Sequence, residues 1–293
     1  MQRLKAYITI SFAYIFACAL ACVLFVSLTA KDPDTTDIII ALLIADITAT
    51  VIIWGFGLGF KNSSFYDPYW SLIPWLMVLA VMIRFDKWSL NNILFLAIFG
   101  IWSWRLTINW AYTCESIKTQ DWRYTMYKQQ NNTFMWHVIN FFGINLMPTL
   151  LVFAALIPAI VTVLINTTPN GFSFVGAAII LLGTVLEFFA DIQMHSFRKS
   201  NRDKNRVQDT GLWKYSRHPN YLGEISVWIG VFVFMLSADI SKWYLITGAL
   251  LMLGLFYFIS IPMMEKRQKS KRPDYKLYQQ TTSKLLLLPP KRL

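Results

Sequence analysis

Long runs of apolar residues dominate this chain, and short polar segments separate them. Each run is roughly 17 to 27 residues long, the length that a helix rising about 1.5 Å per residue needs to cross about 30 Å of hydrocarbon. The pattern therefore predicts membrane-spanning helices rather than the core helices of a soluble domain. We expect apolar spans at residues 5–29, 37–60, 68–84, 89–113, 134–165, 172–198, 221–238 and 242–262.

The fifth stretch is longer than one span requires, and it carries Pro148 and Pro158. Because proline bends or ends a helix, a short interfacial helix through Phe142 followed by one span is an alternative to a single helix. The first stretch follows Arg3 and Lys5 as a signal peptide would, but it is too long for one, and we expect it to stay as an anchor. The pattern thus predicts an all-α polytopic membrane helix bundle of about seven or eight transmembrane helices.

The basic residues predict which side of the membrane each loop faces. With the N-terminus placed inside, the inner segments hold 21 Lys and Arg residues and the outer segments hold 4. Cytoplasmic loops of membrane proteins carry such an excess. We therefore expect a cytoplasmic N-terminus, with the two most basic segments, 199–218 and 263–293, on the cytoplasmic side.

Composition agrees with a membrane protein, since 56% of the 293 residues are hydrophobic and only 15% are charged. Topology and attraction to anionic lipid heads explain the net charge of +11, so the charge requires no nucleic-acid partner. An anionic ligand, such as a phosphate-bearing cofactor at the cytoplasmic face, is the alternative. No internal repeat or Gly/Ser linker is present, and we expect a single integral membrane domain over residues 1–293. The three cysteines predict no disulfide framework and no metal site.

A cluster of ionisable residues lies near the end of the sixth stretch, where such residues are expensive to hold in a membrane. Glu187, Asp191, His195 and Arg198 follow one another at intervals of 4, 4 and 3 residues, which places them on one face of a helix. Two carboxylates one turn apart repel each other, so something must supply donors or positive charge between them. A ligand with amide or hydroxyl donors would do so. The alternatives are a basic side chain such as Arg105, or a metal ion, although the spacing matches no common metal signature.

A second polar segment, residues 211–224, reads Gly-Leu-Trp-Lys-Tyr-Ser-Arg-His-Pro-Asn-Tyr-Leu-Gly-Glu. Pro219 suits the first turn of a helix that begins near Asn220, and the free amides at that helix start attract anions. An interfacial turn anchored by an aromatic belt is the alternative. We expect a phosphate pocket here, to which basic charge is added by Arg202, Arg206, Lys214 and Arg217.

Several of these segments together resemble a known superfamily. Residues 215–224, with Glu-Phe-Phe-Ala-Asp at 187–191 and Glu-Lys-Arg at 265–267, are similar to the steroid 5-alpha-reductase C-terminal superfamily. Within it the chain resembles the bacterial group labelled DUF1295, and the resemblance extends over about residues 60–290. It implies a multi-pass protein of a bacterial inner membrane whose site faces the cytoplasm. Further matching segments lie at residues 62–70, 104–106 and 121–124.

The family implies a bundle of about seven helices that holds NADPH at its cytoplasmic side and reduces a carbon-carbon double bond conjugated to a carbonyl. By this resemblance Glu187 would meet the nicotinamide amide, Asp191 matches an Asp one turn on, and Arg198 matches a phosphate-binding Arg. Asn220 matches the family's Asn, and Glu224 its Glu below the cofactor. The other cofactor-binding residues that we expect are His195, Tyr215, Arg217, His218, Tyr221, Glu265 and Arg267.

The catalytic residues depart from the family's pattern. Steroid reductases hold the substrate carbonyl with a Glu and a Tyr, and the resemblance places Asp67 at the Glu but Trp102 at the Tyr. Trp cannot give a proton to a developing enolate, so Tyr66, Tyr112 or Tyr124 would replace the Tyr. We expect hydride transfer to the beta carbon of an enone, with the oxyanion stabilised by a donor such as a protonated Asp67. The expected catalytic residues are Asp67, Tyr66, Arg105 and Tyr124.

Two other functions are consistent with the residues. Membrane methyltransferases of the isoprenylcysteine and phospholipid type carry a similar Arg-His-Pro-x-Tyr-x-Gly turn and bind S-adenosylmethionine. They show paired glutamates near the last helix, where this chain has Glu265 followed by Lys266. The third hypothesis is a non-enzymatic membrane protein. For the reductase we expect an apolar, lipid-like or steroid-like substrate that enters from the bilayer.

Overall fold

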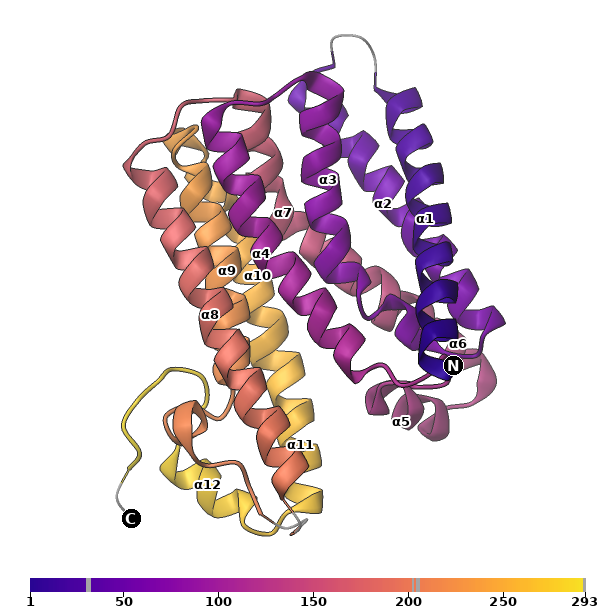
Figure 1. The fold of residues 1–293 in the computed structure, drawn as a ribbon, viewed down its shortest axis with the longest axis vertical. Coiled ribbons are helices and arrows are strands. Elements are labelled where there is room, and N and C mark those ends of the chain that lie inside the picture. The colour runs from indigo at the N-terminus through magenta and orange to yellow at the C-terminus, as the bar shows by residue number, and fades with distance from the viewer. Residues whose placement is uncertain (30–32, 202, 204–205, 292–293) are drawn as a thin grey trace. The chain divides into compact units, whose positions relative to one another are not determined.

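The computed structural model describes residues 1–29, 33–201, 203 and 206–291 (Figure 1). These residues form helices and no β-strand, so the prediction of an all-α polytopic bundle is confirmed. They divide into two compact units, Met1–Pro169 and Asn170–Leu293. Four basic residues used in the predictions of topology and phosphate binding lie outside the described residues: Lys31, Arg202, Lys204 and Arg292.

The first unit contains the first five predicted stretches. Helix α1 packs along α2, and α3 packs against α4 and α7 (Figure 1). Its elements are α1 (Gln2–Leu28), α2 (Thr35–Gly59), the 3-10 helix η1 (Ser63–Tyr66), α3 (Tyr69–Phe85), α4 (Leu90–Thr113), α5 (Trp122–Gln130), α6 (Thr133–Val138), the π-helical segment η2 (Ile139–Leu146) and α7 (Met147–Ile165).

The fifth predicted stretch is one continuous helical run, Thr133–Ile165, rather than a short interfacial helix followed by a span. The π-helical segment lies in its first half, and Pro148 follows in the first turn of α7. Helix α7 continues past Pro158 to Ile165. A proline inside a membrane helix is tolerated where neighbouring groups or local π turns satisfy the freed carbonyls. The two prolines therefore do not divide this span.

The second unit contains the remaining stretches and the basic tail. Helix α8 begins with a capping box. The side chain of Asn170 accepts a hydrogen bond from the backbone amide of Ser173, and the Ser173 hydroxyl accepts one from the backbone amide of Asn170. Pro219 opens α9, as predicted. The elements are α8 (Gly171–Ser200), η3 (Gly211–Lys214), α9 (Pro219–Met235), η4 (Ile240–Leu245), α10 (Ile246–Gly254), the π-helical segment η5 (Leu255–Ser260), α11 (Ile261–Lys271) and α12 (Tyr275–Thr281).

Glycines allow α8 and α9 to lie side by side along their length (Figure 1). A Cβ atom at Gly176 would lie 2.5 Å from the backbone nitrogen of Phe234, and one at Gly183 would lie 2.7 Å from the carbonyl oxygen of Gly223. A Cβ atom at Gly223 would lie 2.5 Å from the Cγ atom of Glu187. Small residues permit such close approach between membrane helices. The packing therefore fixes the start of α9 against the part of α8 that carries Glu187.

Seven helical runs of the described residues are long and apolar enough to cross a membrane. Helix α9, with 17 residues, is a shorter apolar helix at the place of the remaining predicted stretch. The chain is therefore a multi-pass integral membrane protein. The seven runs are Gln2–Leu28, Thr35–Gly59, Ser63–Phe85, Leu90–Thr113, Thr133–Ile165, Gly171–Ser200 and Ile240–Lys271.

The start of α1 and the end of α4 lie at the same end of the first unit. The Arg3 Nε atom donates a 2.9 Å hydrogen bond to the carbonyl oxygen of Cys114, and the Tyr7 hydroxyl donates to that of Ala111 at 2.6 Å. This agrees with the topology, which placed both segments on one side of the membrane. That this side is the cytoplasm stays a prediction.

Candidate functional site

The segment around Asp67 is fastened to the loop that precedes α5. The side-chain amide nitrogen of Asn62 donates to the carbonyl oxygens of Ile117 (2.7 Å) and Thr119 (3.1 Å). Its side-chain oxygen caps the start of η1. The Ser64 hydroxyl accepts a hydrogen bond of 2.8 Å from the backbone amide of Asp121. Since Asp121 caps α5, these contacts position the first turns of α5 over η1.

As a result, Tyr124 of α5 meets Asp67. The Tyr124 hydroxyl donates a hydrogen bond of 2.7 Å to Oδ1 of Asp67. Burial raises the pKa of Tyr124 well above its ordinary value, and the nearby carboxyl of Asp67 raises it further. The phenol therefore keeps its proton and remains a hydrogen-bond donor. The structure thus brings two of the four predicted catalytic residues into direct contact.

Tyr66, the third of these residues, belongs to a different hydrogen-bonded group. Its hydroxyl lies 2.7 Å from Oγ1 of Thr149, which lies 2.9 Å from Oγ1 of Thr50. Its ring stacks on that of Tyr69, with centroids 5.1 Å apart. Tyr66 is 2% exposed. The residue that the Tyr124 hydroxyl contacts is its neighbour Asp67.

The remaining residues of the catalytic prediction lie on α4. Trp102 is fully buried and stacks on Phe99, with centroids 4.8 Å apart, so it is a core residue. Arg105 lies one turn further along the helix and is half-buried. Tyr112 is 65% exposed, whereas Tyr124 contacts Asp67; which tyrosine replaces the family's phenol stays a prediction.

A polar cavity of about 160 Å³ lies next to Asp67. Ser64 and Asp121 also line it, and Asp121 forms an ion pair of 2.8 Å with Arg123. The cavity is large enough for a few water molecules and has polar partners for them. Ser64 and Asp121 were not among the predicted site residues, although both lie in the segments that carry the family resemblance.

In the second unit, the predicted polar face of α8 runs from a buried end to an exposed end. Glu187 is 4% exposed, Asp191 and His195 are half-buried, and Arg198 is exposed. The buried end is acidic and the exposed end is basic. Among the described residues, no group of three or more His, Cys, Asp or Glu side chains is arranged to hold a metal ion.

The segment before α9 is bound to α11 and to the tail through Arg217. Its Nε atom donates to Oε1 of Glu265 at 2.7 Å, and its Nη1 atom donates to the carbonyl oxygens of Gln279 (2.8 Å) and Thr282 (2.6 Å). The side chain of Gln279 donates to the other oxygen of Glu265 at 2.6 Å. Three donor contacts of Arg217 are thus made within the protein. Its predicted role in binding phosphate stays a prediction.

His218 joins the same cluster. Its Nε2 atom lies 3.3 Å from Oε1 of Glu265, and its ring stacks on Tyr221 with centroids 5.3 Å apart. Burial lowers the pKa of His218 below its ordinary value, while the contact with Glu265 opposes this shift in part. Burial thus favours the neutral form of His218.

Backbone contacts attach the tail to the motif as well. The backbone amide of Arg217 donates to the carbonyl oxygen of Ser283 at 2.9 Å, and the Ser216 hydroxyl donates to that of Leu285 at 2.7 Å. The backbone amide of Leu288 donates to the carbonyl oxygen of Tyr215 at 3.1 Å. The basic tail, predicted only from its charge and the Glu265 match, is thus an integral part of this cluster.

The other predicted cofactor residues lie around these two groups. Glu224 is 2% exposed and accepts a hydrogen bond of 2.8 Å from the indole of Trp228. Tyr215 is 41% exposed, and Asn220 and Arg267 are half-buried on α9 and α11. The structure therefore places four of the predicted residues on one face of α8 and brings four others into one cluster, Arg217, His218, Tyr221 and Glu265.

Comparison with known proteins places these segments in one family. The family model described as "Protein of unknown function (DUF1295)" matches residues 53–282. "Uncharacterized protein C594.04c" of Schizosaccharomyces pombe is 23% identical over 272 residues, which cover 84% of this chain and 78% of that protein. No solved structure matches. DUF1295 is related to steroid 5-alpha-reductase-like membrane proteins, and distantly to membrane reductases and methyltransferases. Since the family model matches well over half of the residues, including both groups described above, the chain belongs to the DUF1295 family.

Proposed function

We propose that this protein is a membrane-embedded, NADPH-dependent reductase of a carbon-carbon double bond conjugated to a carbonyl, in an apolar, lipid-like or steroid-like substrate. The observation that carries the proposal is the partly buried hydrogen bond of 2.7 Å between Tyr124 and Asp67. It supplies the pair of a carboxyl and a phenol that the family pattern implies, although Trp102 occupies the expected position of the phenol.

In this proposal, Asp67 and Tyr124 hold the carbonyl oxygen of the substrate. Addition of hydride to the beta carbon moves negative charge onto that oxygen, and hydrogen-bond donors fixed in advance stabilise the charge. Tyr124 suits this role because its raised pKa keeps the hydroxyl protonated. Its single proton is donated to Asp67 in the structure, and in this proposal it turns to the carbonyl oxygen when the substrate binds. Solvent then supplies a proton to the alpha carbon as the enolate collapses, so one hydride from the cofactor and one proton from water reduce the double bond.

The cofactor is assigned to the polar face of α8. NADPH, when bound, supplies the hydride. The carboxylate of Glu187 accepts hydrogen bonds of the kind that a nicotinamide amide donates, and the exposed Arg198 offers charge for a phosphate. The two residues are 11 positions apart, or roughly 16 Å along the helix. An acidic buried end and a basic exposed end fit the opposite ends of such a cofactor, with Asp191 and His195 between them.

Arg217 has a different role in this proposal from the one that its motif implies. Its guanidinium contacts Glu265 and two carbonyl oxygens of the tail, so it positions the tail beside the start of α9. Arg198 is then the residue that carries phosphate recognition. The same proposal places this end of the second unit at the cytoplasmic face of a bacterial inner membrane, with substrate entering from the bilayer.

Two competing functions give different results in one assay. A methyltransferase would bind S-adenosylmethionine, and a non-enzymatic membrane protein would bind neither cofactor. The reductase is favoured because a hydrogen-bonded carboxyl and phenol pair suits an oxyanion better than it suits methyl transfer. The site of a methyl transfer would need a base beside an accepting nucleophile rather than a donor for an oxyanion.

The direct test measures enone-dependent oxidation of NADPH by the purified protein in lipid nanodiscs, across a panel of apolar enones. We expect Tyr124→Phe and Asp67→Ala to lower the rate by roughly 10²- to 10³-fold, the loss seen when one oxyanion donor is removed. Tyr112→Phe is the matched control, because this tyrosine is exposed. A Tyr124→Phe variant with the wild-type rate, or a wild-type protein that oxidises NADPH with no enone of the panel, would overturn the proposal.

A further inference from the structure

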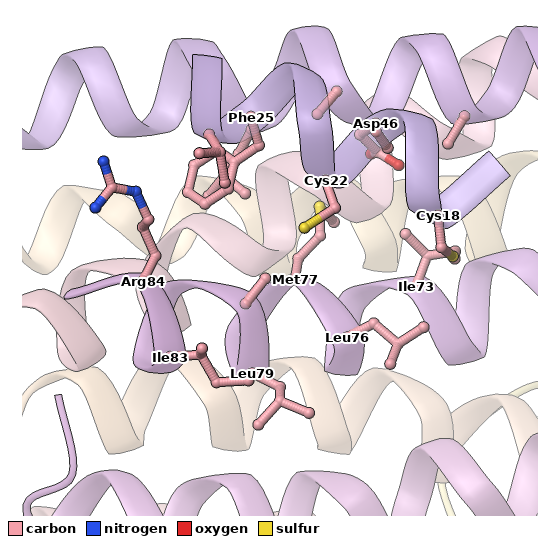
Figure 2. Close-up of a pocket in the computed structure, with 16 residues that line it drawn as sticks. Cys18, Cys22, Phe25, Asp46, Ile73, Leu76, Met77, Leu79, Ile83 and Arg84 are labelled. Carbon is pink, nitrogen blue, oxygen red and sulfur yellow. The ribbon is translucent and has the colours of Figure 1, made fainter. Parts of the chain in front are cut away.

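A second cavity lies within the first unit, between α1, α2 and α3 (Figure 2). Its volume of about 320 Å³ is in the range of ligand pockets. It shares no lining residue with the polar cavity beside Asp67. The small side chains that hollow it out are Ala21 of α1, Ala45 and Ala49 of α2, and Ala80 of α3.

The wall of this cavity is apolar except at two places. Asp46 of α2 is 4% exposed, and its Oδ1 atom accepts a hydrogen bond of 2.7 Å from the Tyr69 hydroxyl. Arg84 lies in the last turn of α3. Figure 2 shows Arg84 at one end of the cavity, with Asp46 and Cys18 toward the other.

Among the described residues that line this cavity, Arg84 has a buried hydrogen-bond donor without an acceptor. Its Nε atom is buried and has no hydrogen-bond partner among them. Its guanidinium lies 5.4 Å from the centroid of the Phe85 ring, a contact that supplies no acceptor for Nε. A buried donor without an acceptor is costly, and a carboxylate satisfies an arginine fork with two parallel hydrogen bonds.

The long axis of the cavity matches a hydrocarbon chain. Ile73 and Arg84 both line it and are 11 residues apart on α3, so it extends roughly 16 Å along that helix. Arg84 lies near the helix end, where the head group of a membrane amphiphile resides, and Asp46 lies deep in the span. An amphiphile seated with its head at Arg84 would therefore lie with its chain parallel to the helices.

We propose that this cavity binds a single-chain carboxylic acid, with its carboxylate on Arg84 and its hydrocarbon chain between α1, α2 and α3. Exposed Cys22 and Val26 line the cavity from α1, so the chain can enter from the bilayer. Asp46 marks the deep end of the binding site, because the terminal methyl group of a longer chain would meet the Asp46 carboxyl, which is hydrogen-bonded to Tyr69. The site is independent of the proposed reductase, since it uses neither Asp67 nor the face of α8.

The test measures binding of radiolabelled palmitate to the protein in nanodiscs without any nucleotide, with hexadecanol as the uncharged competitor. We expect hexadecanol to bind at least tenfold more weakly than palmitate. Arg84→Gln should weaken palmitate roughly tenfold, the loss of one charged hydrogen-bonding group, and leave hexadecanol unchanged. Lys87→Gln is the matched control, because Lys87 follows the same helix end but does not line the cavity.

A second variant tests the position of the chain. Ala80→Leu fills the cavity from a half-buried position, and we expect it to lose both ligands while its melting temperature stays close to that of the wild type. Equal affinities for palmitate and hexadecanol in the wild type would overturn the proposal. So would wild-type palmitate binding by folded Ala80→Leu protein. Displacement of palmitate by two-chain phosphatidylglycerol at equal concentration would show instead that Arg84 contacts only a lipid head group.

Discussion

At the scale of single residues, Arg217 and Glu265 hold two distant segments of the second unit together. Their ion pair is 2.7 Å long, and the side chains are 10% and 12% exposed. Both carboxylate oxygens of Glu265 and three donor contacts of Arg217 are used in this cluster. Because the pair is largely shielded from water, removal of one partner leaves the other charge without compensation.

We expect Glu265→Gln to lower the free energy of unfolding by about 3 kcal/mol, as found when one partner of a buried ion pair is removed. Unfolding of the detergent-solubilised protein by heat or denaturant measures this change. Lys269→Gln, an exposed position on the same helix, serves as the control and should change stability very little. A Glu265→Gln variant as stable as the control would show that the pair contributes no stability.

His218 predicts a dependence of stability on pH. Burial lowers its pKa in the folded protein, with Glu265 opposing and Arg217 and Lys284 adding to the shift. The unfolded chain therefore binds a proton at a higher pH than the folded one. The contribution of His218 to the free energy of unfolding is thus present above about pH 6.5 and is lost on acidification. We expect the melting temperature to fall between pH 7 and pH 5, and to fall less for His218→Gln. An equal fall in both proteins would exclude His218 as the cause.

At the scale of helices, the packing of α8 on α9 positions the proposed cofactor residues. Gly183 and Gly223 face each other beside Glu187, so the two backbones approach more closely than any larger residue allows. The carboxylate of Glu187 is thereby buried at the start of α9. The position of this carboxylate therefore depends on the interface between α8 and α9, and not on α8 alone.

This dependence predicts that Gly223→Ala destabilises the protein by about 1–3 kcal/mol, the usual effect of overpacking. The added Cβ atom would lie 2.5 Å from Cγ of Glu187 and 2.6 Å from the carbonyl oxygen of Gly183. Gly254→Ala is the control, because a Cβ atom there meets nothing within 4 Å. It should be neutral or stabilising by up to about 1 kcal/mol. Thermal unfolding of the two variants compares them, and equal stability would contradict the packing argument.

The spans and the polar face of α8 were predictable from sequence, because hydrophobic length and helical periodicity are local properties. The contact between Tyr124 and Asp67 was not, since it joins residues 57 positions apart through contacts of Asn62 and Ser64. The family resemblance suggested both residues but not their pairing. The attachment of the tail to Arg217 was also absent from the predictions, because no periodic pattern reports a contact between segments so far apart.

At the scale of the whole molecule, topology follows from the distribution of basic residues and is open to a direct test. We expect a cysteine introduced at Lys118 to react with a membrane-impermeant thiol reagent only after the membrane is opened. A cysteine at Lys87 should react in intact cells. Both are made in a background in which the three native cysteines are replaced. The reverse pattern would invert the orientation and place the face of α8 on the wrong side for a cytoplasmic cofactor.

The proposed function has two parts, the binding of the carbonyl by Asp67 and Tyr124 and the binding of the cofactor by the polar face of α8. The carbonyl part rests on an observed contact, the hydrogen bond between Tyr124 and Asp67. The cofactor part rests on the burial and charge of four residues on α8 and on the family resemblance. Cofactor binding is therefore the claim on which the account most depends.

Binding of NADPH, NADH and S-adenosylmethionine to the purified protein in nanodiscs, measured by calorimetry, tests it most directly. We expect NADPH to bind, S-adenosylmethionine not to bind, and Arg198→Ala to weaken NADPH roughly tenfold through loss of a charged contact to phosphate. Lys199→Ala, the neighbouring exposed position, should leave the affinity unchanged. Tight binding of S-adenosylmethionine without any response to NADPH would contradict the account.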